Sequence, residues 1–301
     1  MRRVLSGCLA TLLFLAGCAR VPELESLVAP DASRTGLDGT DGPLGAAYYT
    51  DRTLARVDDL VRYEVVVPMA GGEVLASDEG LPVVVMIHGG FVEVGRYRWI
   101  GTHLATKGYV TVLADHDANL SFLSSGNSLA ALEDVYSQAA VPSHPLQGRL
   151  DGSKPASVLG HSLGGVAAAT LWTAEPDRWD VLAIFASFPA GDTDVEQFDG
   201  RPSIHLVGSE DEPEAKKAQG FDRFSSPRVF GVVEGMNHYA WTDDATESEL
   251  AGDGPALRGL DDVRPDMWRL FDAALDGWML GDADARARLD AGEFPGVEVE
   301  R

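Results

Sequence analysis

The sequence predicts an α/β fold with a mainly parallel central sheet and helices on both of its faces. From about residue 60 onward, short apolar and β-branched runs alternate with helix-length segments. The later runs are almost continuously apolar, as expected of strands that are buried on both faces of a parallel sheet. A chain of 301 residues, of which 45% are hydrophobic, is long enough to form one such domain.

Segments rich in apolar and β-branched residues are predicted to form strands at 61–68, 82–88, 109–115, 156–160, 181–187, 203–208 and 228–233. Segments of helical length are expected to form helices at 99–107, 127–140, 163–174 and 214–219. The stretch 264–282 spaces its apolar residues at helical intervals, with Pro265 near its start and Gly281 close to its end. We expect this last helix to pack against the core.

The N-terminus has the form of a secretory signal, in which two arginines precede a short apolar run. Leu15-Ala16-Gly17-Cys18 resembles the bacterial lipobox, which implies that 1–17 is a signal peptide and that Cys18 carries lipid. We therefore expect an exported protein that is anchored to the bacterial cell envelope. An ordinary signal peptide that leaves Cys18 unmodified is the alternative. Residues 18–45, rich in Pro, Gly, Asp and Ser, are predicted to be a tether, and 46–301 the folded domain.

The formal net charge of −23 argues against nucleic acid as a partner and favours a neutral or cationic substrate over an anionic one. The only two cysteines are Cys8 and Cys18, so the exported domain has no cysteine for an internal disulfide. We expect a monomer that needs neither a metal nor another cofactor.

One short motif suggests a nucleophile. Gly160-His161-Ser162-Leu163-Gly164 fits the G-x-S-x-G pattern, between a strand-like segment and a helix-compatible one. The two glycines permit the close approach that such a sharp turn requires. A serine exposed at that turn becomes a nucleophile when a nearby base removes its proton. The alternative is a glycine-rich connector with an incidental serine. We expect the His161 side chain to point away.

The base and its orienting acid are sought after Ser162. His238 is the one histidine, of seven, that directly follows a late predicted strand, from which it could reach across the carboxyl edge of the sheet. Asp211 comes three residues after a strand that ends at Gly208, between the serine and the histidine in chain order. Other carboxylates that could serve instead are Glu210, Asp192 and Asp194.

Two backbone N–H groups are expected to stabilise the oxyanion that forms when an ester carbonyl is attacked. One belongs to Leu163, directly after the serine. The other belongs to Phe91 or Gly90, in the segment His88-Gly89-Gly90-Phe91 that follows an earlier strand. Side chains that could line a substrate cleft are those of His88, Phe91, Trp99, Phe122, Met236, Tyr239 and Trp241.

The segments MIHGGF, VLGHSLGG, LVGSEDEP and GMNHYAW together resemble the α/β-hydrolase superfamily in their order and spacing. The resemblance covers roughly residues 60–280 and is greatest to dienelactone hydrolase, chlorophyllase, plasma-type platelet-activating-factor acetylhydrolase and cutinase-like enzymes. It implies the α/β-hydrolase fold, a catalytic domain at 46–301 and a Ser162, His238 and Asp211 triad. No segment between 188 and 203 resembles a large lid.

The resemblance further implies a serine hydrolase that cleaves small-molecule or polymer esters through an acyl-enzyme on Ser162. Fold resemblance does not separate this activity from two others of the same class, namely lactone and peptide hydrolysis. A catalytically silent surface-binding lipoprotein is the alternative from a different class.

Overall fold

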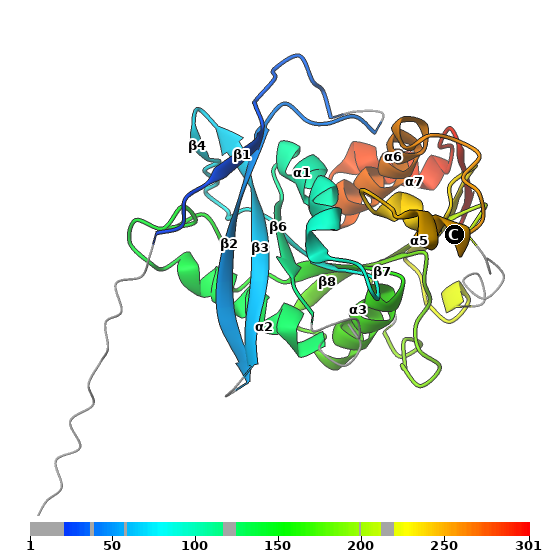
Figure 1. The fold of residues 1–301 in the computed structure, drawn as a ribbon, viewed down its shortest axis with the longest axis horizontal. Coiled ribbons are helices and arrows are strands. Elements are labelled where there is room, and N and C mark those ends of the chain that lie inside the picture. Colours follow the sequence, from blue (N-terminus) through cyan, green and yellow to red (C-terminus); the bar gives the residue numbers. More distant parts are fainter. Residues whose placement is uncertain (1–20, 37–38, 57–58, 117–124, 199, 212–219) are drawn as a thin grey trace, which may run out of the picture.

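The computed structural model describes residues 21–36, 39–56, 59–116, 125–198, 200–211 and 220–301. Within these ranges the strands form a single sheet in the order β1-β2-β3-β6-β5-β7-β8-β9-β10-β11, with β4 paired to β3 (Figure 1). The central strands pair in parallel. They are β5 (Val83–Ile87), β6 (Val110–Ala114), β7 (Ala156–His161), β8 (Trp179–Phe185), β9 (Ser203–Gly208) and β10 (Arg228–Val233).

The two edges of the sheet are antiparallel. They are formed by β1 (Glu25–Val28), β2 (Gly45–Arg56), β3 (Asp59–Ala70) and β4 (Glu73–Val74) on one side and β11 (Val297–Glu300) on the other. The α/β prediction with a mainly parallel sheet is therefore confirmed. The sequence pattern did not reveal β2 and β11, because their residues are partly exposed and interrupt the apolar runs that mark the central strands.

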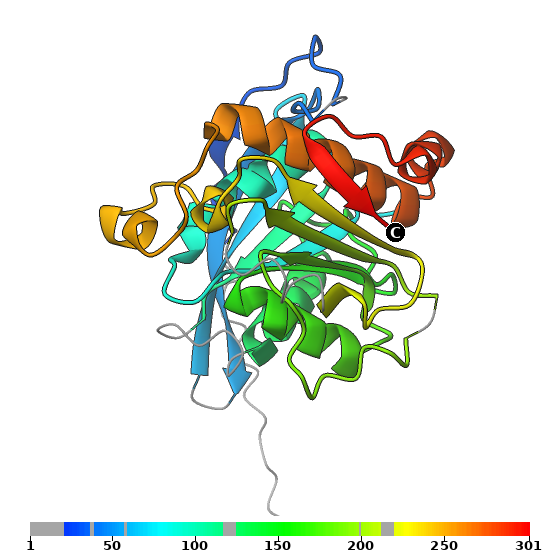
Figure 2. The ribbon, with the colours of Figure 1, turned by 90° about the vertical axis from the view of Figure 1, so that its right-hand side faces the viewer.

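Helices cover both faces of the sheet (Figures 1 and 2). Side chains of α2 (Ser125–Gln138) and α3 (Leu163–Ala174) belong to one buried apolar cluster, and those of α1 (Arg98–Thr106) and α6 (Leu260–Trp278) belong to another. The shorter helices are η1 (Val94–Tyr97), η3 (His238–Trp241), α5 (Glu247–Ala251) and α7 (Ala283–Ala291). A large lid is not evident in the described residues between 188 and 203, where only short turns lie.

The predicted helix at 264–282 is displaced in the structure. α6 begins at Leu260, with Asp261 and Asp262 in its first turn, where acidic side chains favour the helix N-terminus. Pro265 therefore lies inside the helix, and α6 ends at Trp278. The chain then turns, and Asp282 accepts a hydrogen bond from Ala285 N to begin α7.

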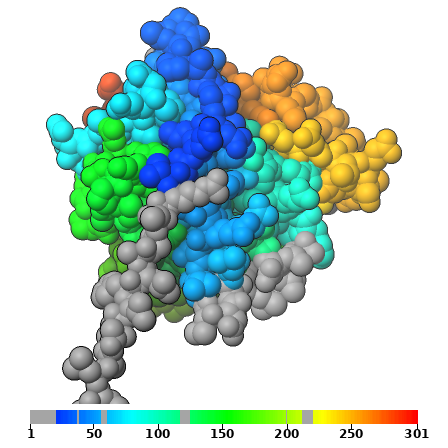
Figure 3. Space-filling model, turned by 60° about the vertical axis from the view of Figure 1, so that its left-hand side comes forward, coloured from blue at the N-terminus to red at the C-terminus, as the bar shows by residue number. Residues whose placement is uncertain are grey.

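The segment that we expected to be a tether, 18–45, is in part a piece of the folded domain. Residues of β1 pair with β2, and the described N-terminal residues lie against the body of the molecule (Figure 3). A Cβ at Gly42 would lie 2.2 Å from Thr106 O, and one at Gly39 would lie 1.9 Å from Pro265 O. These glycines permit close packing, which composition alone does not distinguish from linker flexibility.

Several expectations fall outside the described residues. They concern the signal peptide 1–17, the lipid site Cys18, the cleft residue Phe122 and the helix at 214–219. In the part of the chain that is described, the helices are too short or too polar to cross a bilayer.

Candidate active site

Ser162 occupies a sharp turn between β7 and α3. Its backbone angles are φ 53° and ψ −123°, a conformation that costs a non-glycine residue on the order of 1–3 kcal/mol. A Cβ at Gly160 would lie 2.1 Å from Gly164 O, and a Cβ at Gly164 would lie 2.2 Å from Ile87 O. Both glycines of the motif are thus required by close backbone contacts, and the serine is held in a strained turn at the carboxyl edge of the sheet.

The loops after β9 and β10 bring Asp211 and His238 together. His238 Nδ1 lies 2.9 Å from Asp211 Oδ1. The aspartate side chain is fully buried, whereas that of the histidine is 24% exposed. Because a carboxylate accepts, Nδ1 carries the proton, and Nε2 of the neutral ring is left as a proton acceptor. This is the arrangement that a general base requires.

The neighbouring residues fix the position of this histidine. Asn237 Oδ1 accepts from Ala240 N at 3.1 Å, and Asn237 Nδ2 donates to Gly254 O at 2.9 Å. The other predicted carboxylates are placed differently. Glu210 accepts from the hydroxyl of Ser209 at 2.9 Å, and both Asp192 and Asp194 are exposed on the loop after β8.

The side chain of His161 does not point away from the site, as the motif led us to expect. It is buried, and its ring centroid lies 4.7 Å from that of His238. Its Nε2 lies 3.2 Å from His238 O, and its Nδ1 lies 2.7 Å from the hydroxyl of Tyr97. His161 is the last residue of β7, so its side chain lies on the same face of the strand as that of Leu159, which is the face that Tyr97 and Trp241 cover.

The donors and acceptors around His161 form a chain with one direction. The hydroxyl of Tyr97 accepts from Gly89 N at 2.9 Å, so its single proton is donated to His161 Nδ1. Nε2 must then carry the ring proton and donate it to His238 O. These hydrogen bonds connect Gly89, in the loop after β5, to the loop that carries His238, and they pass through His161, the residue before Ser162. Sequence reasoning missed Tyr97, since a tyrosine in a helical segment gives no signal of this role.

Ser187 is a second residue that the sequence did not single out. Its hydroxyl donates to Ser162 O at 2.5 Å, and a Cβ at Gly165 would lie 2.6 Å from Ser187 Cβ. It therefore helps to hold the strained turn from the end of β8. The exposed Phe188 follows it directly.

The loop after β5 lies beside the serine. A Cβ at Gly89 would be 3.4 Å from Ser162 Cβ. His88 is buried, with Nδ1 donating to Gly89 O at 2.8 Å and Nε2 accepting from His116 N at 3.1 Å. Burial lowers the pKa of His88 and keeps its ring neutral, as these two bonds require. Phe91 has φ 61° and is 74% exposed, so an unusual turn follows two residues after the glycine that lies beside Ser162.

Three of the expected cleft residues do not line a cleft at the serine. Met236 and Trp241 are fully buried in the core, where Trp241 stacks on Phe185 with centroids 4.4 Å apart. Trp241 is the last residue of η3, and Met236 lies in the loop before η3. His88, also buried, supports the backbone as described above.

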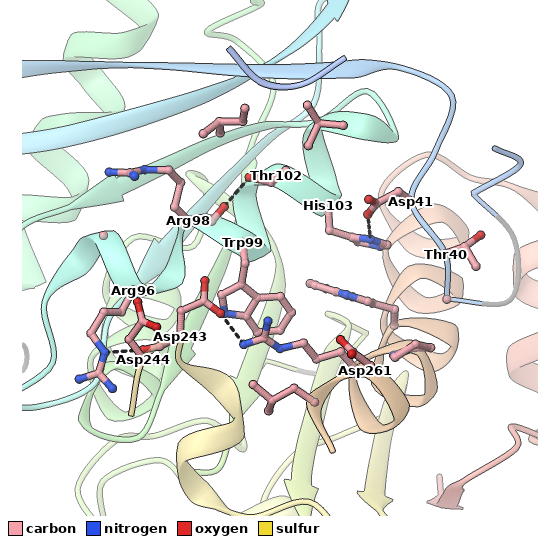
Figure 4. A pocket seen from close by; sticks show the side chains of 18 of the residues that line it. Thr40, Asp41, Arg96, Arg98, Trp99, Thr102, His103, Asp243, Asp244 and Asp261 are labelled. Atoms are coloured by element: carbon pink, nitrogen blue, oxygen red, sulfur yellow. Dashed lines mark hydrogen bonds and ion pairs between the residues drawn. The ribbon is translucent and has the colours of Figure 1, made fainter. Parts of the chain in front are cut away.

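Trp99 lines a different cavity, of about 850 Å³, between α1, α6 and the N-terminal segment (Figure 4). Arg264 lies over its ring at 3.7 Å and donates to Asp243 at 2.7 Å. Ser162, Asp211 and His238 are not among the described residues that line this large cavity. Cavity volume therefore does not identify the candidate active site. The site is identified by the turn at Ser162 and by the bond between His238 and Asp211.

A model of the alpha/beta hydrolase family matches residues 83–260, a range that contains Ser162, Asp211 and His238. This chain belongs to that family. Membership agrees with the observed sheet and indicates a hydrolase. No curated protein matched the chain. Among the described residues, no group of three or more His, Cys, Asp or Glu side chains could hold a metal ion.

Proposed function

We propose that this alpha/beta hydrolase is a serine hydrolase that cleaves carboxylic esters through an acyl-enzyme on Ser162. The observation that carries the proposal is the bond between His238 Nδ1 and the buried Asp211, together with a serine at φ 53° whose preceding residue, His161, contacts His238 O. A strained serine next to an oriented imidazole is what nucleophilic acyl transfer needs.

In the proposed reaction, His238 Nε2 removes the proton of Ser162 Oγ as the oxygen attacks the ester carbonyl. Asp211 keeps the ring in the required tautomer and stabilises the imidazolium that forms. The N–H groups of Phe91 and Leu163 donate to the oxyanion. Collapse of the intermediate transfers the imidazolium proton to the departing alcohol. Water, activated by the same histidine, then releases the carboxylic acid and restores the serine.

The surroundings of the serine favour an ester with an apolar acyl or alcohol part. Phe91 is 74% exposed and Phe188 is 38% exposed, and each belongs to a loop that contacts Ser162 or its immediate neighbours. The net charge of −23 favours a neutral or cationic substrate over an anionic one. Small-molecule esters and polymer esters both fit this description.

The test is a series of p-nitrophenyl esters of increasing chain length, combined with a fluorophosphonate probe, on the wild type and Ser162→Ala. We expect turnover and labelling in the wild type, and loss of both in the variant by at least about 10⁴-fold with an unchanged melting temperature. Labelling without ester turnover would favour a lactone or peptide substrate. Absence of both in the wild type would favour a silent binding protein.

We further propose that the protein is exported and held at the bacterial cell envelope by lipid on Cys18. The proposal rests on Leu15-Ala16-Gly17-Cys18 in the sequence. The two chains of a diacylglyceryl group would anchor the domain firmly, whereas one acyl chain binds only marginally. Cys18→Ser should move the protein from the membrane to the soluble fraction. An unmodified cysteine in the mass spectrum of the membrane-associated protein would contradict the proposal.

A further inference from the structure

A second cavity, of about 400 Å³, lies where the start of β10, the end of α6, α7 and the C-terminal residue meet. We refer to it as the arginine pocket. Figure 2 shows α6, α7 and β11 coming together at this corner of the molecule. The lining residues on which the argument depends are Arg228, Arg286, Arg301, Trp278, Val229 and Leu289. Ser162, Asp211 and His238 are not among them.

The charge of the pocket is opposite to that of the protein. Its lining side chains include three arginines and a single acid, Asp290, in a chain with a net charge of −23. In the described part of the chain, none of these three arginines forms an ion pair, although nine others do, such as Arg96 with Glu249 and Arg98 with Glu64. In the described protein, no carboxylate is therefore paired directly with these three guanidinium groups.

Backbone carbonyl groups hold the three guanidinium groups in place. Arg228 Nη1 donates to Phe221 O at 2.8 Å and to Phe224 O at 2.9 Å. Arg286 Nε donates to Gly277 O at 2.6 Å, and Arg301 Nη1 donates to Asp290 O. A carbonyl oxygen orients a guanidinium but does not cancel its charge. Each group has five N–H donors, so several remain for a ligand.

Apart from Ser226 and Asp290, the rest of the lining is apolar. Val229 and Leu289 are buried, at 2% and 6% exposure, and Trp278 is half-buried. The volume is within the range typical of small-molecule sites, which combine apolar walls with a few oriented polar groups. An occupant would therefore need an anionic end for the guanidinium groups and an apolar body for the walls.

We propose that the arginine pocket binds a small amphipathic carboxylate. A planar carboxylate matches the fork of a guanidinium and can accept two parallel hydrogen bonds from it. Because the lining contains three positive side chains and one negative side chain, we expect the ligand to be an anion of low charge. The site is separate from the candidate active site, and the inference does not depend on the proposed ester hydrolysis.

Isothermal titration of the full chain with octanoate tests the inference, with 1-octanol and inorganic phosphate as the two partial ligands. The variant is Arg286→Gln, because Arg286 is exposed on α7 and its side chain makes a single hydrogen bond, to Gly277 O. Arg288→Gln is the matched control, since Arg288 lies on the same helix and does not line the pocket. Arg228→Gln is a second variant, and melting temperatures check that each protein is folded.

We expect saturable binding of one octanoate, weakened about tenfold or more by Arg286→Gln and by Arg228→Gln and unchanged by Arg288→Gln. Octanol and phosphate should each bind at least tenfold more weakly than octanoate. Equal binding of octanol would overturn the role of the arginines, and equal binding of phosphate would overturn that of the apolar walls. Octanoate binding that persists in both folded arginine variants would place it elsewhere, for instance beside Ser162, and would refute the proposal. No octanoate binding to the wild type would refute it as well.

Discussion

Two buried histidines on one side of the sheet, His161 and His103, engage both ring nitrogens but with different kinds of partner. His161 lies between the Tyr97 hydroxyl and the carbonyl oxygen of His238. His103 lies between two carboxylates, with Nδ1 3.0 Å from Asp41 and Nε2 3.1 Å from Asp272. The first ring has one donor and one acceptor position in use, whereas the second has two donors.

The partners therefore determine the charge of each ring. At His161, one neutral tautomer accepts from the hydroxyl and donates to the carbonyl, so the ring is oriented and carries no charge. Two carboxylates require the imidazolium form. Burial opposes that charge, but Asp272 and Asp41 outweigh burial and raise the pKa of His103 above its ordinary value. The comparison suggests that His161 positions the candidate active site, while His103 fastens the N-terminal segment and α6 to α1.

Removal of the carboxylate at the active site should have the largest effect. In Asp211→Asn, the side-chain amide can donate to Nδ1 and favour the wrong tautomer of His238, so we expect ester turnover to fall several hundredfold or more. Glu210→Gln is the matched control and should lower turnover less than tenfold, because Glu210 bonds to Ser209 instead. The reverse ranking of the two initial-rate measurements would reassign the acid to Glu210.

Removal of the carboxylate beside His103 should change stability and leave catalysis intact. Asp272 also accepts from Lys107 at 2.9 Å, so Asp272→Asn breaks two buried charged contacts. We expect the free energy of unfolding to fall by about 3 kcal/mol in urea titrations, with ester turnover within threefold of wild type. Asp261→Asn, an exposed position in the first turn of the same helix, should lower stability by less than about 1 kcal/mol, since it removes only an interaction with the helix N-terminus. Equal effects in the two variants would remove the distinction between the two histidine sites.

Tyr97→Phe tests whether the neutral hydrogen-bond chain positions the active site. The change removes the hydroxyl that contacts both Gly89 N and His161 Nδ1, so the loop after β5 and the end of β7 lose a restraint that they share. We expect ester kcat to fall about tenfold with KM little changed, since small displacements of reacting groups are costly. Tyr136→Phe, whose hydroxyl bonds to Lys154 O near the surface, is the control. A loss of stability with unchanged kcat would make Tyr97 structural only.

The smallest effect concerns the pH dependence of His103. A raised imidazole pKa stabilises the fold fully below the unfolded value of about 6.5 and loses this contribution as the pH rises through the folded value. His103 and Lys107 outweigh the burial of Asp272 and lower its pKa, so the carboxylate's contribution disappears only as the pH falls through that low value. His103→Gln should therefore cost about 1 kcal/mol more at pH 6 than at pH 9 in urea titrations. A cost that is independent of pH would mean that the ring is neutral.

The sequence by itself determined the features that depend on local pattern. Continuous apolar runs predicted the parallel strands, because burial on both faces leaves no polar position. The glycines around Ser162 predicted a sharp turn between a strand and a helix, and spacing after the strands selected Asp211 and His238, which the structure brings within 2.9 Å. Each of these inferences requires only a few neighbouring residues.

Only the tertiary structure decided which side chains meet across the fold. Tyr97, His161 and Ser187 come from separate elements, and their contacts depend on how η1 and the segment after β8 pack against the serine turn. Met236 and Trp241 are large apolar residues close to His238 in the sequence, but both side chains are buried in the core. The glycine-rich N-terminal segment has the composition of a linker, yet it packs on α1 and pairs through β1 with β2. Composition records which side chains are apolar, small or charged, whereas the packing of distant elements determines what each one contacts.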